Sequence, residues 1–407
     1  MPNKKNSLLT NLQDLCRVPS PSLQEREVVK VLAKKVRDLG YEPLEDDAAA
    51  TIGGDCGNIV VKVPGTGKGP RLLLSAHMDT VEKSGGLPAE PVVEGEWVRR
   101  DGGGILGADD KTGVAILLEV LERLSKGDKK HGDLVFAFTM AEELECLGAS
   151  ELDPEIYVNL DGGVALDYTR PSEIVIAAPT KVSFRITVHG IGGHAAAPER
   201  RINAAYVLAQ TVSRMPMGRL DAFTTANLGI MQSGTAINII PGTAYAEYEI
   251  RSHRKDVLDF HVKRIIGIIE GVVRENRVFT LGTPTGLGED GVTPIGDDIK
   301  IRYSQVDVDV EVGYEGFRLP EKAFIVEKAR AAAKKAGLEP TLITAQGGSD
   351  ANIFNRRGLE SIVLGCGMYG AHGPAERANL VDMHDCVEVL MHLITDSRVS
   401  MRGKGGK

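Results

Sequence analysis

The chain has 407 residues, of which 42 % are apolar and 26 % charged, the balance of a folded globular protein rather than of a disordered or fibrous one. Lys and Arg number 48 against 56 Asp and Glu, giving a formal net charge of −8 at pH 7, so the composition disfavours nucleic acid and anionic membranes as partners. This length exceeds what one hydrophobic core usually organises, and two domains are expected.

The N-terminal residues contain no apolar segment typical of a signal peptide, and no run reaches the roughly 18 apolar residues of a membrane helix. The cysteines are scattered, odd in number and without a CxxC pair: Cys16, Cys56, Cys146, Cys366 and Cys386. This usage argues against a disulfide framework and against a thiolate zinc site. We therefore expect a cytoplasmic protein.

The first part of the chain predicts a layered α/β sheet. Residues 7–39 have apolar positions at helical spacing, interrupted at Pro19 and Pro21, and residues 111–124 predict a second helix. Short β-rich runs alternate with helical segments, at residues 58–63, 71–76, 134–139, 157–160 and 174–177. Such alternation is typical of a sheet with helices on its faces.

The pattern changes near Thr180. Residues 182–188 alternate between apolar and polar, as in a sheet with one exposed face. With this strand, the following segments predict the β-α-β-β-α-β order of a ferredoxin-like unit: helix 203–214, strands 225–232 and 243–251, helix 256–274 and a strand near 306–312. A helix at 321–336 and a strand at 361–364 return to the first pattern.

We therefore expect an α/β domain of residues 1–178 and 315–407, interrupted by an α+β domain of residues 179–314. Within the insert, residues 282–298 are rich in Gly and Asp and predict an exposed loop. Residues 402–407 predict a frayed tail.

Metal-competent side chains follow four of the predicted strands: His77 with Asp79, Glu142 with Glu143, Asp161, and His372. A fifth candidate, Asp109-Asp110, stands at the start of the helix 111–124. Since ligands of open α/β sheets bind beyond the carboxyl ends of the strands, these side chains could converge there. Imidazole with carboxylate suits Zn²⁺, Mn²⁺ or Co²⁺. The surplus of carboxylates fits two ions bridged by one Asp, with an adjacent Glu as general base.

Taken singly, each of these residues has an ordinary explanation. A lone histidine at a strand end is usually a polar loop residue, and Asp109-Asp110 could cap a helix. Glu142-Glu143 could be a solvated pair, and Asp161-Gly-Gly a turn. Their coincidence at strand ends is what favours a metal centre. A dinucleotide site at Gly102–Gly107 is disfavoured, because no predicted strand directly precedes these glycines.

Five motifs resemble those of the M20 family of metallopeptidases, and most of all its peptidase T-like (tripeptidase-like) branch: Ser75-Ala-His-Met-Asp-Thr-Val81, Leu106-Gly-Ala-Asp-Asp-Lys-Thr-Gly113, Ala141-Glu-Glu143, Asn159-Leu-Asp-Gly-Gly163 and Gly347-Gly-Ser-Asp-Ala-Asn352. The similarity runs in order along nearly the whole chain. It implies a zinc-peptidase-like α/β catalytic domain with two zinc ions. It also implies a smaller ferredoxin-like lid domain, which in this family commonly forms the dimer interface.

The resemblance implies five metal ligands: His77 and Asp161 on one ion, Glu143 and His372 on the other, and Asp109 bridging the two. If the motif register were shifted by one, Asp110 would exchange roles with Asp109. The wording around His372 departs somewhat from the usual family motif. His384 is the alternative ligand, although its helical surroundings favour a histidine on a helix surface.

The resemblance also implies roles for residues that do not bind metal. Asp79 would orient His77, and Glu142 would be the general base that later protonates the leaving amine. In the insert, His194 would reach across a dimer to stabilise the oxyanion, and Asn238 and Arg251 would contact the substrate. Each of these three has the ordinary alternative of a polar residue in a loop or at a strand end.

The function implied is hydrolysis of amide bonds in short peptides, best matched by an aminopeptidase acting on tripeptides, with Glu142 assisting attack by a metal-bridged water. The metal would be zinc, with Mn or Co as alternatives, and the protein a homodimer through the lid domain. An N-acyl amino acid deacylase or a carboxypeptidase of the same family stays open, as does a non-catalytic metal-bound scaffold. The requirement for a free substrate α-amino group separates the first two hypotheses.

Overall fold

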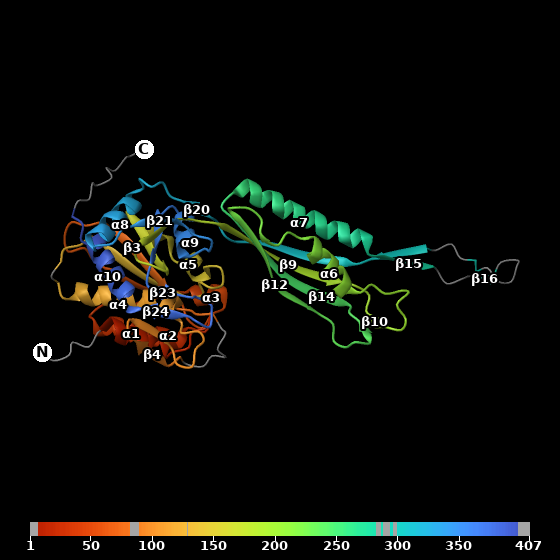
Figure 1. Ribbon diagram of the computed structural model, residues 1–407, viewed down its shortest axis with the longest axis horizontal. Helices are drawn as coiled ribbons and strands as arrows, with labels where there is room; N and C mark the ends of the chain where they lie inside the picture. Colours follow the sequence, from red (N-terminus) through yellow and green to blue (C-terminus); the bar gives the residue numbers. More distant parts are fainter. Residues whose placement is uncertain are drawn as a thin grey trace. The chain divides into compact units, whose positions relative to one another are not determined.

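The structure is a computed structural model that describes residues 7–81, 89–127, 129–281, 286–287, 294–295 and 299–397. The chain divides into two compact units, Met1–Ala178 with Tyr314–Lys407, and Pro179–Gly313 (Figure 1). Among the described residues, none of the helices is both long and apolar enough to span a membrane. The predicted loop 282–298 lies outside these residues, apart from the short strands β16 (Gly286–Leu287) and β17 (Pro294–Ile295). The tail 402–407 lies wholly outside them.

A mixed nine-stranded sheet forms the centre of the first unit (Figure 1). Its strands follow the order β1-β2-β6-β3-β7-β22-β8-β20, with β21 also paired to β8. The four strands β6, β3, β7 and β22 are parallel, so their carboxyl ends meet at one edge of the sheet. The strands are β1 Leu44–Glu45, β2 Ile59–Val63, β3 Leu72–His77, β6 Leu134–Thr139, β7 Gly162–Tyr168, β8 Glu173–Ala178, β20 Phe317–Arg318, β21 Thr341–Thr344 and β22 Ser361–Gly365.

The central strands are buried because helices pack against the sheet. β3 and β6 are mostly apolar and are buried at every position, as expected for parallel strands covered on both faces. Helix α4 contacts β3 and packs against α1 and α10 in the largest core. The helices of this unit are α1 Ser7–Cys16, α2 Arg26–Asp38, α3 Ala48–Ile52, α4 Ala108–Ser125, α5 Leu147–Glu151, α8 Phe324–Lys335, α9 Asp350–Arg356 and α10 Leu380–Ile394, with a 3₁₀ turn at Pro154–Tyr157.

A second, four-stranded sheet carries the loop of His372. Its order is β23-β24-β5-β4, and the bounds are β4 Pro91–Glu94, β5 Trp97–Arg100, β23 Met368–Tyr369 and β24 Arg377–Asn379. The hairpin of β23 and β24 therefore presents His372 at its tip. All five cysteines of the chain are free and buried.

The predicted strand at 157–160 is wrong. Residues up to Tyr157 form a 3₁₀ turn, and the strand of this region is β7, Gly162–Tyr168. β7 opens with two glycines, which weaken the apolar signal of the strand. Gly163 is required by close packing, since a Cβ there would collide with the Ser361 side chain on β22. The carboxyl end of this strand is consequently several residues later than the sequence pattern indicated.

The second unit has the predicted ferredoxin-like arrangement. Its antiparallel strands lie in the order β11-β12-β14-β9-β19, with helices α6 and α7 sharing their core (Figure 1). β9 alternates buried apolar with more exposed residues, as expected for a sheet covered on one face. The elements are β9 Thr180–His189, β10 Gly193–His194, α6 Ala204–Arg214, β11 Gly218–Arg219, β12 Thr224–Ser233, β13 Ile239–Ile240, β14 Thr243–Ser252, α7 Lys255–Glu275, β15 Arg277–Leu281, β16 Gly286–Leu287, β17 Pro294–Ile295, β18 Ile299–Tyr303 and β19 Gln305–Tyr314.

Candidate metal centre

The carboxyl ends of the parallel strands bring polar side chains together in the first unit. His77 is the last residue of β3, and Asp167 lies next to the last residue of β7. Glu142 and Glu143 follow β6, and Asp109 lies at the start of α4. The alignment of strand ends therefore explains why residues distant in the sequence converge.

Asp109 lies between the two histidines. Its Oδ1 is 3.0 Å from His77 Nε2, and its Oδ2 is 3.2 Å from His372 Nε2. Glu143 Oε1 is 2.7 Å from the same nitrogen of His372. Two donor groups thus share Asp109, namely His77 with Asp109 and Asp167, and Asp109 with Glu143 and His372. Within each group the donor atoms lie within 4.8 Å of one another.

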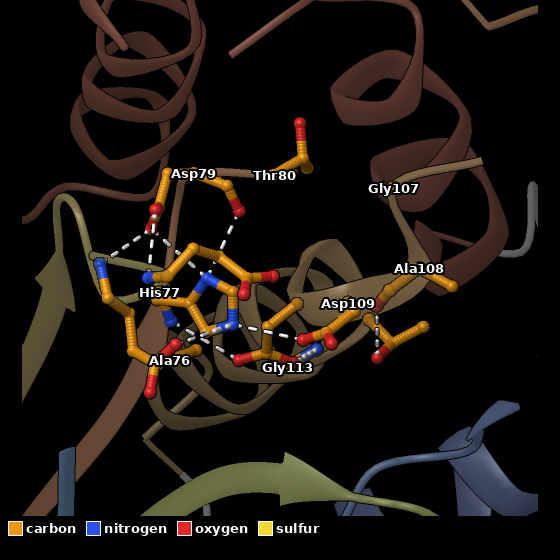
Figure 2. A network of polar contacts seen from close by, with 12 residues as sticks. Ala76, His77, Asp79, Thr80, Gly107, Ala108, Asp109 and Gly113 are labelled. Carbon is orange, nitrogen blue, oxygen red and sulfur yellow. Dashed lines mark hydrogen bonds and ion pairs between the residues drawn. The ribbon is translucent and has the colours of Figure 1, made fainter. Parts of the chain in front are cut away.

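Asp79 holds His77 on the side opposite Asp109 (Figure 2). His77 Nδ1 is 3.2 Å from Asp79 Oδ1 and 3.0 Å from the Asp79 carbonyl oxygen. The carboxylate also accepts hydrogen bonds from the backbone N–H groups of Glu142 and Glu143, at 2.9 and 3.1 Å, and from the Ser22 hydroxyl. Asp79 therefore holds in place both the His77 ring and the turn that contains Glu142 and Glu143, which we call the Glu-Glu turn.

A buried carboxylate from the His372 hairpin fixes the backbone of Asp109. Glu376 accepts hydrogen bonds from the N–H groups of Gly107, at 2.7 Å, and Asp109, at 3.3 Å. The Asp109-Asp110 peptide bond is cis. Asp110 has a different environment, since its carboxylate accepts from the N–H groups of His77 and Gly113. The two adjacent aspartates are thus directed to different partners.

The electrostatics of the centre indicate a shortage of positive charge. Burial raises the pKa of Glu142 and of Asp167 well above their ordinary values. Burial lowers the pKa of His77, but its hydrogen bonds to Asp109 and Asp79 outweigh this effect and leave the pKa well above 6.5. Glu142 and Asp167 thus ionise less readily than free carboxyl groups, and His77 keeps its proton more readily than free histidine. Both effects are expected where clustered carboxylates lack a cation to balance their charge. The donor set of imidazole and carboxylate therefore fits divalent metal ions.

Glu142 lies beside both donor groups without belonging to either. Its Oε2 is 4.0 Å from His77 Nε2, and its Oε1 accepts a hydrogen bond from the Cys146 thiol at 3.3 Å. A partly exposed carboxylate with a raised pKa, next to a candidate metal-binding cluster, has the properties of a general base.

The predicted ligand Asp161 is wrong. Asp161 immediately precedes β7, so it lies at the amino ends of the parallel strands, beside Arg71. Its Oδ1 is 2.8 Å from Arg71 Nη2, and its Oδ2 accepts from the Arg71 N–H at 2.9 Å. The length of β3 separates this ion pair from His77 by roughly 20 Å. The residue at the correct end of the strand is Asp167.

Comparison with known proteins identifies the family. The sequence profile of Peptidase family M20/M25/M40 matches residues 73–396. The chain belongs to this family. Uncharacterized protein YqjE of Bacillus subtilis is 31 % identical over 399 residues, which cover 98 % of this chain and 100 % of that protein. The predicted M20 membership is therefore confirmed.

Two solved structures share the fold of this M20 chain. Aminopeptidase PepT from Bacillus cereus is 31 % identical with a TM-score of 0.77, and the alignment covers 96 % of this chain and 98 % of that one. A tripeptidase from Staphylococcus aureus is 30 % identical with a TM-score of 0.81, again over 96 % and 98 % of the two chains. The predicted fold, a zinc-peptidase-like α/β unit with a ferredoxin-like insert, is confirmed.

Three further predicted site residues of this M20 peptidase lie in the inserted unit. His194 on β10 is exposed, and Asn238 lies beside it, because the N–H of Ala195 donates to the Asn238 carbonyl at 3.0 Å. Asn238 lies before the start of β14, whereas Arg251 lies near the end of that strand. There the Arg251 guanidinium pairs with the Glu249 carboxylate at 2.9 Å. The structure thus brings His194 and Asn238 together and leaves Arg251 apart from them.

An open pocket of about 520 Å³ lies beside His372. It is lined by Arg100, by the glycine loop Gly102–Gly104 and by the residues that follow His372, including Pro374. The three glycines have positive φ, so this loop adopts a course that other residues would strain. The glycine-rich segment therefore shapes free space next to the metal centre.

Sequence reasoning missed three residues of the centre: Asp167, Glu376 and Asp350. Asp167 follows the apolar run Val164-Ala-Leu166, and correct placement of β7 would have found it. Glu376 lies four residues after His372, and its contact with the Asp109 backbone has no sequence signal. Asp350 belongs to the motif 347–352. It accepts a hydrogen bond from the Thr139 hydroxyl at 2.5 Å, and burial raises its pKa to about 6.

Proposed function

We propose that this M20 peptidase is a metal-dependent aminopeptidase that acts on short peptides, tripeptides above all. The observation that carries the proposal is the pair of donor groups sharing Asp109, with Glu142 beside them. The substrate class is supported by the tripeptidase and the aminopeptidase PepT, which match this chain over nearly its whole length.

The proposed ligands are His77, Asp109 and Asp167 for one ion, and Asp109, Glu143 and His372 for the other. Zinc suits this set of imidazole and carboxylate donors, and Mn²⁺ or Co²⁺ are alternatives. Two such ions, when bound, would polarise the scissile carbonyl and make water acidic enough to lose a proton near neutral pH. This proposed ligand set differs from the one expected from the sequence at a single position, because Asp167 takes the role first given to Asp161.

Glu142 takes the proton from the attacking water in the proposed mechanism and returns it to the leaving amine. A carboxylate whose pKa is raised from its ordinary value towards the working pH suits both steps, because it can then accept a proton from water and release it again to the amine. Asp79 fixes the N–H groups of Glu142 and Glu143, so the position of the base is set by the backbone. The pocket beside His372 provides room for the peptide.

Three residues of the inserted unit have proposed roles at the substrate. His194 would donate a hydrogen bond to the oxyanion from a second copy of the chain, as charge develops there. Asn238 would contact the substrate next to His194. Arg251 would bind a substrate carboxylate, and since its guanidinium already pairs with Glu249, the substrate would compete with that residue.

We further propose a cytoplasmic homodimer formed through the inserted unit. β12 pairs with β14 along one edge, whereas β11 covers only its beginning, at Thr225 and Ala226. The uncovered part of β12 exposes Ile230 and Met231. An exposed apolar edge strand is a surface to which a second strand can add. Light scattering coupled to size exclusion tests this, and a monomer at working concentration would contradict it.

The test of the activity is hydrolysis of a panel of dipeptides, tripeptides and N-acetyl amino acids, followed by mass spectrometry. Metal-free protein would be compared with protein given Zn²⁺, Mn²⁺ or Co²⁺. We expect release of the N-terminal residue from tripeptides only when metal is restored. Cleavage confined to the acylated compounds would overturn the aminopeptidase assignment in favour of a deacylase.

A further inference from the structure

A second cluster of metal-competent side chains lies in the first unit, outside the centre around Asp109. Glu25 immediately precedes α2, and Asp55 and Cys56 lie in the loop between α3 and β2. These three residues each offer one donor atom, and the three atoms lie within 4.8 Å of one another. Glu25 and Cys56 are fully buried, whereas Asp55 is exposed, so an ion can reach the cluster from solvent past Asp55.

Glu25 has one satisfied and one unsatisfied carboxylate oxygen. Oε1 accepts a hydrogen bond from the Ala141 N–H at 2.9 Å. Oε2 is buried and has no hydrogen-bond partner among the described residues. Burial, together with the nearby Asp79 carboxylate, raises the pKa of Glu25 to about 7. A buried carboxylate oxygen without a partner is costly, and such atoms usually have a ligand, a water or an ion to explain them.

The two segments that carry the cluster are held in place by the backbone. The Asp55 N–H donates to the Leu23 carbonyl at 3.1 Å, and the Arg26 N–H donates to Asp55 Oδ1 at 3.0 Å. Gly54 lies directly against Met140, since a Cβ at Gly54 would collide with that side chain. The loop that carries Asp55 and Cys56 is therefore packed against Met140, two residues before Glu142.

Arg26 lies beside the cluster, and its positive charge is already compensated. Arg26 forms two hydrogen bonds to the Glu45 carboxylate, both of 2.8 Å, and also contacts the Asp55 carbonyl. With that pair neutralised, Glu25 and Asp55 leave a surplus of negative charge next to the Cys56 thiol. A divalent cation would supply the missing charge and the missing partner of Glu25 Oε2.

We propose that Glu25, Asp55 and Cys56 form a third metal site, which binds Zn²⁺ or another thiophilic divalent ion. Thiolate and carboxylate are both zinc ligands, and solvent at the exposed side would complete four-coordination. Cys56 loses its thiol proton to solvent as the metal–sulfur bond forms. A search of the sequence for CxxC pairs does not find this site. The proposed partners of Cys56 are carboxylates, and one of them, Glu25, comes from a distant segment.

The site acts on the peptidase centre through Glu25. The same carboxylate that would bind the ion supports the N–H of Ala141, the residue before Glu142. A bound ion would keep Glu25 ionised and therefore strengthen this hydrogen bond. The third ion is thus a positioning element for the Glu-Glu turn and does not touch the substrate.

Cobalt(II) tests the proposal directly, because a thiolate ligand gives a sulfur-to-cobalt charge-transfer absorption in the near ultraviolet. The ligands proposed for the peptidase centre include no cysteine, so the band reports only on a cysteine-containing site. We expect the full-length wild-type protein to bind about three equivalents of Co²⁺ or Zn²⁺ and to show the band with Co²⁺. Cys56→Ser should lose the band and one equivalent, and Asp55→Asn, an exposed and structurally mild change, should weaken binding of the third equivalent at least tenfold.

Cys146→Ser is the matched control, since Cys146 is a second buried cysteine close to carboxylates. It should keep both the band and the third equivalent. Absence of the band in wild type, or its loss in Cys146→Ser with retention in Cys56→Ser, would overturn the proposal. The result is independent of peptidase activity, because metal content and absorption are measured without substrate.

Discussion

The two ends of strands β3 and β7 carry similar residues and differ in what surrounds them. At the amino ends, Asp161 meets Arg71, and the two charges neutralise one another. At the carboxyl ends, Asp167 lies with His77 and Asp109, and the acids outnumber the cations. The same two strands thus end in a salt bridge on one side and in an uncompensated donor cluster on the other.

The comparison shows that residue type alone does not indicate a metal ligand. An aspartate beside a strand end becomes a candidate ligand when it lies at the edge where parallel strands finish and when no arginine satisfies it. Asp161 fails both conditions, whereas Asp167 meets both. Substitutions at one end of the strands at a time therefore separate the two environments.

The largest effect is expected from Glu142→Gln at the carboxyl end. Gln keeps the size of Glu but cannot accept the proton, so turnover of a tripeptide should fall by about 10²–10⁴-fold, the usual contribution of a general base. Metal content, measured by mass spectrometry of the metal-loaded protein, should stay unchanged. Turnover within tenfold of wild type would contradict the role of Glu142.

Asp167→Asn should remove most of the affinity of the first donor group for its ion. The neutral amide is a poor ligand, so the loss should exceed the 10- to 100-fold that is typical when only an outer hydrogen bond is removed. Equilibrium dialysis with Zn²⁺ measures it, and activity should fall in parallel. Wild-type affinity in this variant would remove Asp167 from the ligand set.

Asp79→Asn should have an intermediate effect, because Asp79 contacts His77 and the turn of Glu142 and Glu143 and is not itself a proposed metal ligand. We expect metal affinity to fall by about 10- to 100-fold, with part of the activity recovered at high metal concentration. A titration of activity with Zn²⁺ is the measurement. Failure of excess metal to restore any turnover would indicate that Asp79 has a direct part in the chemistry.

Asp161→Asn should have the smallest effect and is the control for Asp167→Asn. The Arg71–Asp161 pair is partly exposed, so its loss should cost at most about 1 kcal/mol in the free energy of unfolding. Urea unfolding measures this, and metal content and turnover should match wild type. A loss of bound metal here would reverse the comparison between the two strand ends.

The fold was largely predictable because its signals are local. The mostly apolar runs of β3 and β6, the alternation in β9, and the helical spacing in α4 and α7 all lie in short windows of sequence. β7 was misplaced because its two glycines pack through the absence of a side chain, which no hydrophobic pattern records. The four-stranded sheet that carries His372 was missed because its strands are only two to four residues long.

The site was predictable where it follows strand ends and motifs, as for His77, Asp109, Glu142 and Glu143. Their assigned roles stay predictions until the variants are measured. Prediction of Asp167 required the exact position of β7 in the sequence. Prediction of Glu376 required knowledge of a contact between residues 267 positions apart. Contacts of that kind depend on the assembled fold, so a single sequence contains no local signal for them.

The way the insert leaves and re-enters the first unit has a consequence for biosynthesis. β8, which precedes the insert, and β20, which follows it, are antiparallel neighbours, with Ala178 opposite Phe317. The insert therefore replaces the turn of a hairpin. β22, however, lies between β7 and β8 and is synthesised after the insert. On the ribosome, the second unit can complete its own core while the central sheet still has a gap, so its folding would precede assembly of the peptidase centre.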